Sequence, residues 1–349
     1  MKRALLTAAL LAASLSAHAA DSINLGNYSV AGTYGLDRLN GTNGGISGLE
    51  ASAVAYARDR GTLFFVGDEG TGVVEISLTG ATLGYMNFNW AGTGSSKNDT
   101  EGLTYLGNGV LVVGEERLQD AYRFSYVAGG TAVLANDFVS ISNTNVGNSG
   151  MEGISYDPRN GSFVTIKQVG PEDIRAGTLT FAPATGGLPA SLPSNGASPT
   201  GGGVSTMATL FDPSLMGLST LSDVQTLSPV DALAGTAAAD NLLVLSLGSR
   251  KLVEVDRSGN VISSFDLSSV LNSVGSDFNA IEGVTIDEKG TIYLVAEQLQ
   301  GAGETAFSQS QLIVLTAPVP EPETYALMLA GLGLVGLASR RKSRRIRIG

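Results

Sequence analysis

Short apolar segments separated by turn sequences follow one another along most of this chain. The segments are rich in Val, Leu, Ile, Phe and Tyr, and glycine-containing turns such as residues 107–109 and 159–161 separate them. Between its two ends, the chain has no segment with a long helical period of apolar residues. The pattern therefore predicts an all-β protein made of short strands.

One hairpin unit recurs in this pattern. Its first strand begins with Glu-Gly, and a tight turn leads to a second apolar strand that ends in a polar or acidic residue. Clear copies begin at Glu101, Glu152 and Glu282. A variant begins at Ser52, and a degenerate copy begins at Ser222. The copies recur about every 50 residues, with insertions, and repeats of roughly this length are typical of β-propeller blades.

The repeat predicts a β-propeller of five or six blades. We expect the N-terminal residues 23–30 and the C-terminal residues 311–315 to share one blade and close the ring, which would remove the exposed sheet edges. A sixth blade would have to lie between Gln168 and Leu221. That interval also holds a Gly/Ser/Pro-rich stretch at residues 183–203, which favours a long loop.

The N-terminus carries an export signal. Lys2 and Arg3 precede an apolar stretch at residues 4–15, and Ala17-His18-Ala19 supplies small residues for cleavage. Residues 1–19 are therefore predicted to be a secretory signal peptide. The propeller domain is then expected over residues 20–318, outside the cytoplasm.

The C-terminal tail, residues 319–349, has three parts. Pro320-Glu321-Pro322 is followed by an apolar run at residues 325–339 and by a basic cluster at residues 340–345. This order resembles the PEP-CTERM sorting signal, and the resemblance implies recognition by an exosortase. The apolar run is short for a membrane span, which needs ~20 residues, and the basic cluster would stay cytoplasmic. An ordinary C-terminal anchor is the alternative.

We accordingly expect a protein that is exported through the inner membrane. After processing of the tail it would lie in the cell envelope, at the cell surface or outside the cell. Membrane contact is expected through the C-terminal segment alone, as a short transmembrane segment, and the propeller is expected to be monomeric.

Composition excludes several kinds of site. The chain has no cysteine, and its one histidine, His18, lies in the predicted signal peptide. Residues 20–318 therefore cannot form a Ser-His-Asp or Cys-His catalytic centre, a His-ligated zinc site or a disulfide. Without the two ends, 13 basic residues remain against 30 acidic ones, a net charge of about −17. Such a surface repels nucleic acid and attracts cations.

The repeat also predicts where carboxylates gather. In an antiparallel hairpin the start of the first strand lies beside the end of the second, so acidic residues at both places would meet at one mouth of the propeller channel. The predicted ring consists of Asp68, Glu101, Glu115, Glu152, Glu282 and Glu297. Lys167 would be a partial counter-charge, whereas Glu69 and Glu116 are expected to face solvent.

Three consequences of such a ring stay open. The carboxylates could hold a hard cation, take raised pKa values, or pair with Lys and Arg. Oxygen ligands without His or Cys select calcium or magnesium, and calcium better tolerates an irregular cage. Calcium is therefore the expected cofactor. The alternatives are an architectural role, in which each Glu accepts a hydrogen bond from a neighbouring blade, and a catalytic acid/base pair.

The repeated Glu-Gly turns, together with residues 113–124 and 150–158, resemble the SdiA-regulated (YjiK-like) family of exported β-propellers. The resemblance covers roughly residues 45–315 and implies a propeller fold and a bound calcium ion, but no known reaction. The sequence departs from the family pattern at Gln168 and Leu247, where an acid is usual. A weaker similarity is to phytase-like esterase propellers.

Two functions follow as hypotheses. The preferred one is a non-catalytic, calcium-binding scaffold in the envelope or matrix. The tail suggests that its partner is an exopolysaccharide or a surface protein. The alternative is a calcium-dependent hydrolase of phosphate esters, lactones or sugar esters, with Glu101 or Glu282 as general base. No Gly-x-Ser-x-Gly motif is present to supply a nucleophile.

Overall fold

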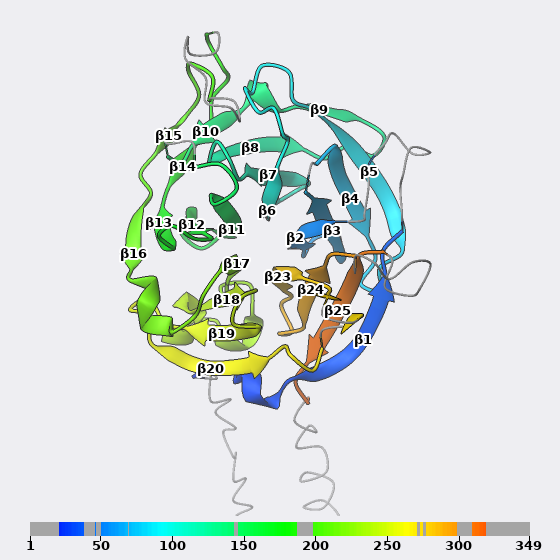
Figure 1. Cartoon of the computed structure of the whole chain (residues 1–349), viewed down its shortest axis with the longest axis vertical. Coiled ribbons are helices and arrows are strands. Elements are labelled where there is room, and N and C mark those ends of the chain that lie inside the picture. The colour runs from blue at the N-terminus through cyan, green and yellow to red at the C-terminus, as the bar shows by residue number, and fades with distance from the viewer. Residues whose placement is uncertain are drawn as a thin grey trace, which may run out of the picture.

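Five β-sheets stand like blades around a common axis in the computed structural model of the chain (Figure 1). The structure describes residues 21–37, 46, 50–68, 70–142, 146–186, 198–270, 273–274, 277–298 and 309–318. Within these ranges the chain is all-β apart from short 3-10 turns.

Each blade is built on four antiparallel strands. They run from the axis outward in chain order in blades 1 to 4, whereas the outermost strand of blade 5 is the N-terminal one. Blade 1 contains β2 (Ala51–Ala57), β3 (Thr62–Gly67), β4 (Gly72–Ile76) and β5 (Thr82–Asn89), with β9 (Thr131–Val133) added in parallel outside β5. Blade 2 contains β6 (Thr100–Gly107), β7 (Val110–Glu115), β8 (Asp120–Ser125) and β10 (Phe138–Ser140). Blade 3 contains β11 (Met151–Asp157), β12 (Ser162–Lys167), β13 (Asp173–Gly177) and β16 (Ala208–Phe211).

The last two blades follow the same plan. Blade 4 contains β17 (Leu221–Thr226), β18 (Leu242–Ser246), β19 (Lys251–Val255) and β20 (Val261–Asp266). Blade 5 contains β23 (Ile281–Ile286), β24 (Ile292–Ala296), β25 (Gln311–Thr316) and β1 (Ser29–Gly35). Two small sheets lie outside the blades: β14 (Leu179–Thr180) with β15 (Val204–Ser205), and β21 (Ser273–Val274) with β22 (Asp277–Phe278).

Short 3-10 turns occupy some of the connections. They are η1 (Leu25–Asn27), η2 (Leu134–Asn136), η3 (Pro213–Met216), η4 (Asp231–Leu233) and η5 (Ala237–Asp240).

The propeller has five blades, and the two ends of the domain close the ring as expected. Between Gln168 and Leu221 the described strands are β13 and β16, which complete blade 3, and the small sheet of β14 and β15. They do not form a sixth blade. The N-terminal β1 pairs with the C-terminal β25 from Ser29–Thr316 to Gly35–Gln311.

The inner strands of the blades are largely apolar because both of their faces are covered by neighbouring blades. In β3, Phe64 and Val66 enter the hydrophobic cluster between blades 1 and 2, whereas Leu63 and Phe65 enter the cluster between blades 1 and 5. Side chains alternate between the two faces of a strand. One run of consecutive apolar residues therefore serves two interfaces.

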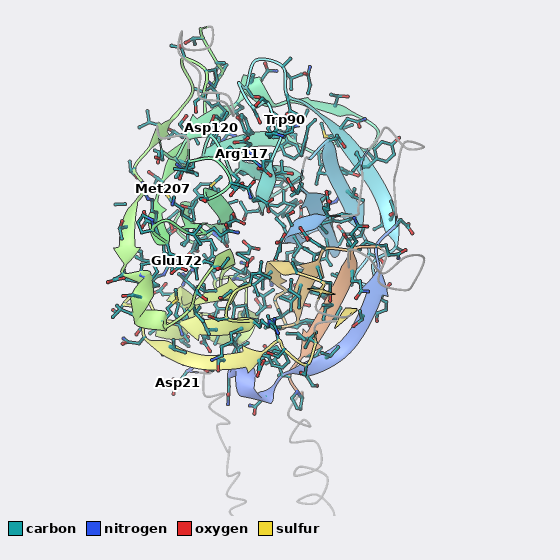
Figure 2. All side chains as sticks on the ribbon, in the orientation of Figure 1. Asp21, Trp90, Arg117, Asp120, Glu172 and Met207 are labelled. Atoms are coloured by element: carbon teal, nitrogen blue, oxygen red, sulfur yellow. The ribbon has the colours of Figure 1, made fainter. Side chains whose placement is uncertain are left out.

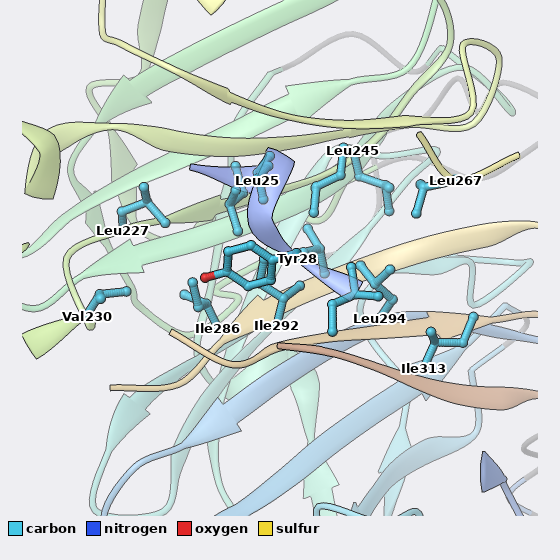
Figure 3. Packing of buried hydrophobic residues seen from close by; sticks show 14 of the residues in the cluster. Leu25, Tyr28, Leu227, Val230, Leu245, Leu267, Ile286, Ile292, Leu294 and Ile313 are labelled. Atoms are coloured by element: carbon cyan, nitrogen blue, oxygen red, sulfur yellow. The ribbon is translucent and has the colours of Figure 1, made fainter. Parts of the chain in front are cut away.

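Five such clusters fill the five interfaces between blades. The cluster between blades 4 and 5 also takes in the N-terminal turn η1 (Figure 3). There the ring of Tyr28 is buried, and its hydroxyl donates a hydrogen bond to the carbonyl of Gly290 at 2.7 Å. The N-terminal segment is thus part of the core.

The predicted signal peptide with its cleavage site lies outside the described residues, and so does the C-terminal tail with the apolar run at residues 325–339. Among the described residues, no helix has the length and apolar character needed to cross a membrane.

Candidate functional site

A β-bulge recurs at the start of every innermost strand. In all five hairpins the pairing between the first and second strands shifts by one residue at the same place. The extra residues are Ser52, Glu101, Glu152, Ser222 and Glu282. A bulge bends the strand and re-aims the side chain of the extra residue. The repeated Glu of the sequence motif is therefore the bulged residue of blades 2, 3 and 5.

A second set of equivalent positions follows the second strand of each blade. The backbone N–H of this residue donates a hydrogen bond, at 2.8–3.0 Å, to the carbonyl of the residue two before the bulged one. The donor–acceptor pairs are Asp68–Glu50, Glu116–Asp99, Gln168–Gly150, Leu247–Thr220 and Glu297–Ala280. The bond holds each of these residues next to the bulge.

These two positions bring carboxylates together at one end of the propeller axis. We call the following residues the acidic cluster: Glu50, Asp68, Asp99, Glu101, Glu116, Glu152, Glu282 and Glu297. One oxygen from each of Asp68, Asp99 and Glu101 lies within 4.8 Å of the other two, a spacing that can hold a metal ion. Glu101 is 9% exposed and Glu152 is 5% exposed.

Burial and mutual repulsion raise the pKa values of this cluster. The pKa of Glu101 lies well above its usual value, first because of burial and then because of the charges of Glu152 and Glu282. Burial, followed by the charge of Glu116, likewise raises the pKa of Glu152. Burial raises the pKa of Glu297 to about 7. Like charges at this spacing cannot all stay ionised without compensation.

Protons on some of these carboxyl groups would supply part of that compensation. Carboxyl groups hydrogen-bond to each other in the pairs Asp68–Asp99, Glu116–Glu152 and Glu282–Glu297. Such a bond requires a proton on one partner.

Arg117 is the cation that pairs with this cluster. Its guanidinium forms an ion pair with Asp99, which is 2% exposed. Figure 2 shows Arg117 closer to the centre of the ring than Trp90. By contrast, the ammonium of Lys167 donates to the backbone carbonyls of Val169 and Pro171. The partial counter-charge expected from Lys167 thus reaches the acidic cluster only through its proximity to the charge of Glu116.

The structure does not bring Glu115 to the acidic cluster. Its carboxylate accepts hydrogen bonds from the hydroxyl of Ser95 at 2.7 Å and from the backbone N–H of Leu118 at 2.6 Å. It lies near Asp120, and burial raises the pKa of Glu115 to about 7. Glu116 takes its place in the cluster and is 2% exposed, rather than solvated as expected. The other predicted ring residues, Asp68, Glu101, Glu152, Glu282 and Glu297, do come together.

The hydrogen bonds between blades come from residues that the sequence reasoning passed over. Thr104 accepts from the N–H of Tyr156, Ser155 from the N–H of Thr226, and Thr285 from the N–H of Tyr56. Each acceptor lies three residues after the bulged position. Three of the repeats carry a Ser or Thr two positions after the Glu-Gly pair, and this recurrence could have predicted the hydrogen bonds between blades.

Asp223 also accepts a hydrogen bond from the backbone of the neighbouring blade. Its two carboxylate oxygens accept from the N–H groups of Val224 and Val284, both at 2.7 Å. It occupies the place that glycine holds in three other blades. Asp223, the hydroxyl residues and Glu116, which accepts from the N–H of Gly150 at 3.1 Å, thus make bonds of the kind that was considered for the repeated Glu.

The glycine of the Glu-Gly pair permits close packing between blades. A Cβ on Gly153 would lie 2.4 Å from Oδ1 of Asp223 and 2.8 Å from its Cα. A Cβ on Gly283 would lie 2.9 Å from the Cα of Ala53 in blade 1. Innermost strands of neighbouring blades thus approach too closely for a side chain here.

The donor set fits a hard divalent cation. It consists of carboxylate oxygens, and calcium takes six to eight oxygen ligands in irregular geometry. Asp68, Asp99 and Glu101 would be the first ligands, and Glu152 and Glu282 extend the carboxylate set to blades 3 and 5.

Comparison with protein families gives two matches. The SdiA-regulated family model matches residues 38–298. The model of the PEP-CTERM protein-sorting motif matches residues 318–342.

Several solved structures are similar to this chain at low sequence identity. One is the glutaminyl cyclase of Myxococcus xanthus, at 12% identity and a TM-score of 0.45, covering 83% of this chain and 95% of that chain. Another is the PQQ-bound aldose sugar dehydrogenase of Streptomyces coelicolor, at 11% identity and a TM-score of 0.44, covering 82% and 97%. A third is the Cps50 (Swd1) β-propeller domain of Myceliophteria thermophila, at 12% identity and a TM-score of 0.34, covering 82% and 73%.

Proposed function

Because the chain belongs to the SdiA-regulated family and carries a PEP-CTERM protein-sorting motif, we propose that it is an exported β-propeller that binds calcium at its acidic cluster. The sorting motif implies processing by an exosortase and sorting to the envelope or surface. The cation-binding role is the proposal, and the cluster of Asp68, Asp99 and Glu101 supports it.

The single observation that carries this proposal is the spacing of those three carboxylates. Their oxygens lie within 4.8 Å of one another in a largely buried setting. Without a cation, the cluster is compensated by shared protons and by Arg117. A divalent cation would replace the protons and join residues from several blades.

The role we infer is that of a binding or scaffold module. Asp68 follows β3 of blade 1, Asp99 and Glu101 begin blade 2, and Glu152 begins blade 3. A cation held between them would cross-link blades at the axis and stiffen the ring. An exopolysaccharide or a surface protein would be the partner of the sorted protein.

Calorimetric titration of CaCl₂ into the EDTA-treated protein tests the proposal. We expect binding that releases protons, seen as a dependence of the heat on the ionisation enthalpy of the buffer. Glu101→Gln should weaken binding at least about tenfold, which corresponds to ~1.4 kcal/mol. Glu115→Gln is the matched control, because this carboxylate is buried on the same hairpin but lies outside the cluster.

Two results would contradict the proposal. One is the absence of both heat and a thermal shift with calcium or magnesium. The other is an equal loss of binding in the Glu115→Gln control. A panel of phosphate esters, sugar esters and lactones, assayed on the calcium-loaded protein, tests the hydrolase alternative. Turnover that disappears with Glu101→Gln or Glu282→Gln would establish that alternative.

A further inference from the structure

A cavity lies at the opposite end of the propeller axis from the acidic cluster. Its volume is about 570 Å³, within the range of small-molecule sites. The turns between the first and second strands of the blades line it, through residues such as Asp59, Asn108 and Pro158. Tyr105, a cavity residue, lies four positions after the bulged Glu101 on the same strand, a span of roughly 13 Å of extended chain. The cavity is thus separate from the candidate cation site.

Three tyrosines from adjacent blades line this cavity. Tyr56, Tyr105 and Tyr156 occupy the same place in β2, β6 and β11, four residues after the bulged position, and each is half-buried. In blades 4 and 5 the equivalent residues are Thr226 and Ile286. The aromatic surface is therefore confined to three blades on one side of the axis.

Each of these rings is held in place by a second aromatic ring. Tyr56 stacks on Tyr293 with centroids 6.2 Å apart, and Tyr105 stacks on Phe64 at 5.9 Å. Tyr156 packs on Phe163 at 5.0 Å. Aromatic side chains fixed in this way lose little conformational freedom when a ligand covers them.

The hydroxyl groups of two tyrosines are already engaged. Tyr105 accepts a hydrogen bond from the backbone N–H of Gly109 at 2.7 Å, and it also bonds to Asp59. Tyr56 bonds to Glu288. The rings themselves are therefore what these two residues can offer to a ligand.

The remaining polar groups of the cavity carry little free charge. Arg58 forms a two-pronged ion pair with Asp231, with both bonds at 2.9 Å. Asp59 accepts from the backbone N–H of Asn108 at 3.0 Å and bonds to Tyr105. The other polar lining groups include the amides of Gln225 and Asn108 and the hydroxyl of Ser228. The acidic balance of the protein also disfavours an anionic ligand.

A second cavity of about 570 Å³ adjoins the first and shares Leu106, Gly107, Asn108 and Tyr156 with it. The ion pair of Arg123 with Asp137 lies in its lining. Both cavities contact the turn between β6 and β7 of blade 2. An elongated ligand fits this arrangement better than a compact one.

We propose that this tyrosine-lined cavity binds a neutral oligosaccharide. Sugar rings present C–H faces that pack on aromatic rings, and their hydroxyls pair with amides and hydroxyls without requiring a counter-charge. The adjoining cavity would receive the next sugar unit of the chain. This site is separate from the candidate cation site. It rests on the proposed function and deepens it, because it would be the surface that binds the exopolysaccharide partner.

Binding to a panel of glycans tests the proposal. The probes are neutral di- to tetrasaccharides of glucose, mannose, galactose and N-acetylglucosamine, with uronate-containing oligosaccharides for comparison. Hits from saturation-transfer NMR are titrated by calorimetry. We expect at least one neutral series to bind, and Tyr156→Ala to weaken its binding about tenfold by removing one ring face.

Three variants make this test specific. Tyr156→Phe keeps the ring and should bind within about threefold of the original protein. Pro229→Trp places a bulky side chain in the cavity lining without removing a tyrosine. It therefore tests glycan binding in this cavity even if Tyr156→Ala does not fold. Glu101→Gln, at the other end of the axis, should leave glycan binding unchanged.

The proposal fails if no neutral glycan binds at millimolar concentration, or if only uronate-containing glycans bind. It also fails if glycan binding survives Pro229→Trp, or is lost with Glu101→Gln. Loss of glycan binding in Pro229→Trp, together with calcium binding at the level of the unmodified protein, would support it and separate the two sites.

Discussion

The carboxylate of Asp223 in blade 4 accepts a hydrogen bond at 2.7 Å from the backbone N–H of Val284 in blade 5. This bond satisfies an N–H group at the inner edge of β23, where no further strand can pair. Thr104, Ser155 and Thr285 do the same for other blades. The glutamates of the repeat are consequently not needed for this purpose and are available for a ligand.

Asp223→Ala is expected to destabilise the propeller. It leaves the buried N–H groups of Val224 and Val284 without their side-chain acceptor, and each unsatisfied group costs about 1–3 kcal/mol. Asp223→Asn retains one carbonyl oxygen, so its free energy of unfolding should lie between those of Asp223→Ala and the unmodified protein. Urea denaturation at pH 5 measures the change. Equal stability of the alanine variant and the unmodified protein would show that the bond between the blades contributes nothing.

Gly153→Ala tests the close approach of blades 3 and 4. The added methyl group would lie 2.4 Å from Oδ1 of Asp223, so the strands must move apart, and we expect a loss of about 1–3 kcal/mol. Gly26→Ala is the control, because the nearest atom to its added Cβ is the Asn24 side-chain oxygen at 3.4 Å. Thermal melts of the two variants make the comparison. Similar melting temperatures would mean that the interface yields easily.

Gln168→Glu adds a carboxylate at the position equivalent to Asp68, Glu116 and Glu297. We expect tighter calcium binding, because a further negative charge joins the acidic cluster. We also expect a lower melting temperature at pH 7 in EDTA, because that charge lies beside groups that already repel one another. Calorimetry and thermal melts measure the two effects. Unchanged calcium affinity would place Gln168 outside the cation site.

The stability of the metal-free protein is expected to fall as the pH rises from about 4 to about 7. In the unfolded chain carboxyl groups titrate near 4. In the folded protein burial raises the pKa values of Glu115, Asp120 and Glu297 to about 7, and those of Glu101, Glu152 and Glu282 also rise. The folded state therefore binds more protons in this interval, and the free energy of unfolding decreases as the pH increases.

Denaturation in EDTA at pH 4.5, 6 and 7.5 measures this dependence. Saturating calcium should restore stability at pH 7.5 and have little effect at pH 4.5, where protons occupy the carboxylates. A stability that rises with pH throughout this interval in EDTA would contradict the assigned pKa directions.

Much of the fold follows from local features of the sequence. Tight turns and short apolar runs define each hairpin, and the copies beginning at Ser52, Glu101, Glu152, Ser222 and Glu282 are the innermost strands of the five blades. The closing strand was also predictable, because an unpaired N-terminal strand and an unpaired C-terminal strand have an obvious partner in each other. The number of blades was left open because residues 168–221 contain strands whose assignment to blade 3 depends on pairing.

A cluster of carboxylates at one end of the axis was predictable from the sequence. The residue predicted for the second strand of blade 2, Glu115, was wrong by one position. Side chains along a strand alternate between two faces, so a shift of one residue moves a carboxylate to the other side. The sequence Glu115-Glu116 offers both choices, and the hydrogen bond from the N–H of Glu116 to the carbonyl of Asp99 selects Glu116. Asp99 lies two residues before the motif, at the position equivalent to Glu50, and joins the cluster through the turn before β6.

The sequence by itself determined that this is an all-β repeat protein with a C-terminal sorting motif and no cysteine, because composition, turns and apolar runs are local properties. Only the tertiary structure decided which carboxylates meet, that Asp223 joins two blades, and that three tyrosines line one cavity. Those relationships depend on the strand register, on the bulges and on the packing of one blade against the next. Each of these features is determined by contacts between residues that lie far apart in the chain.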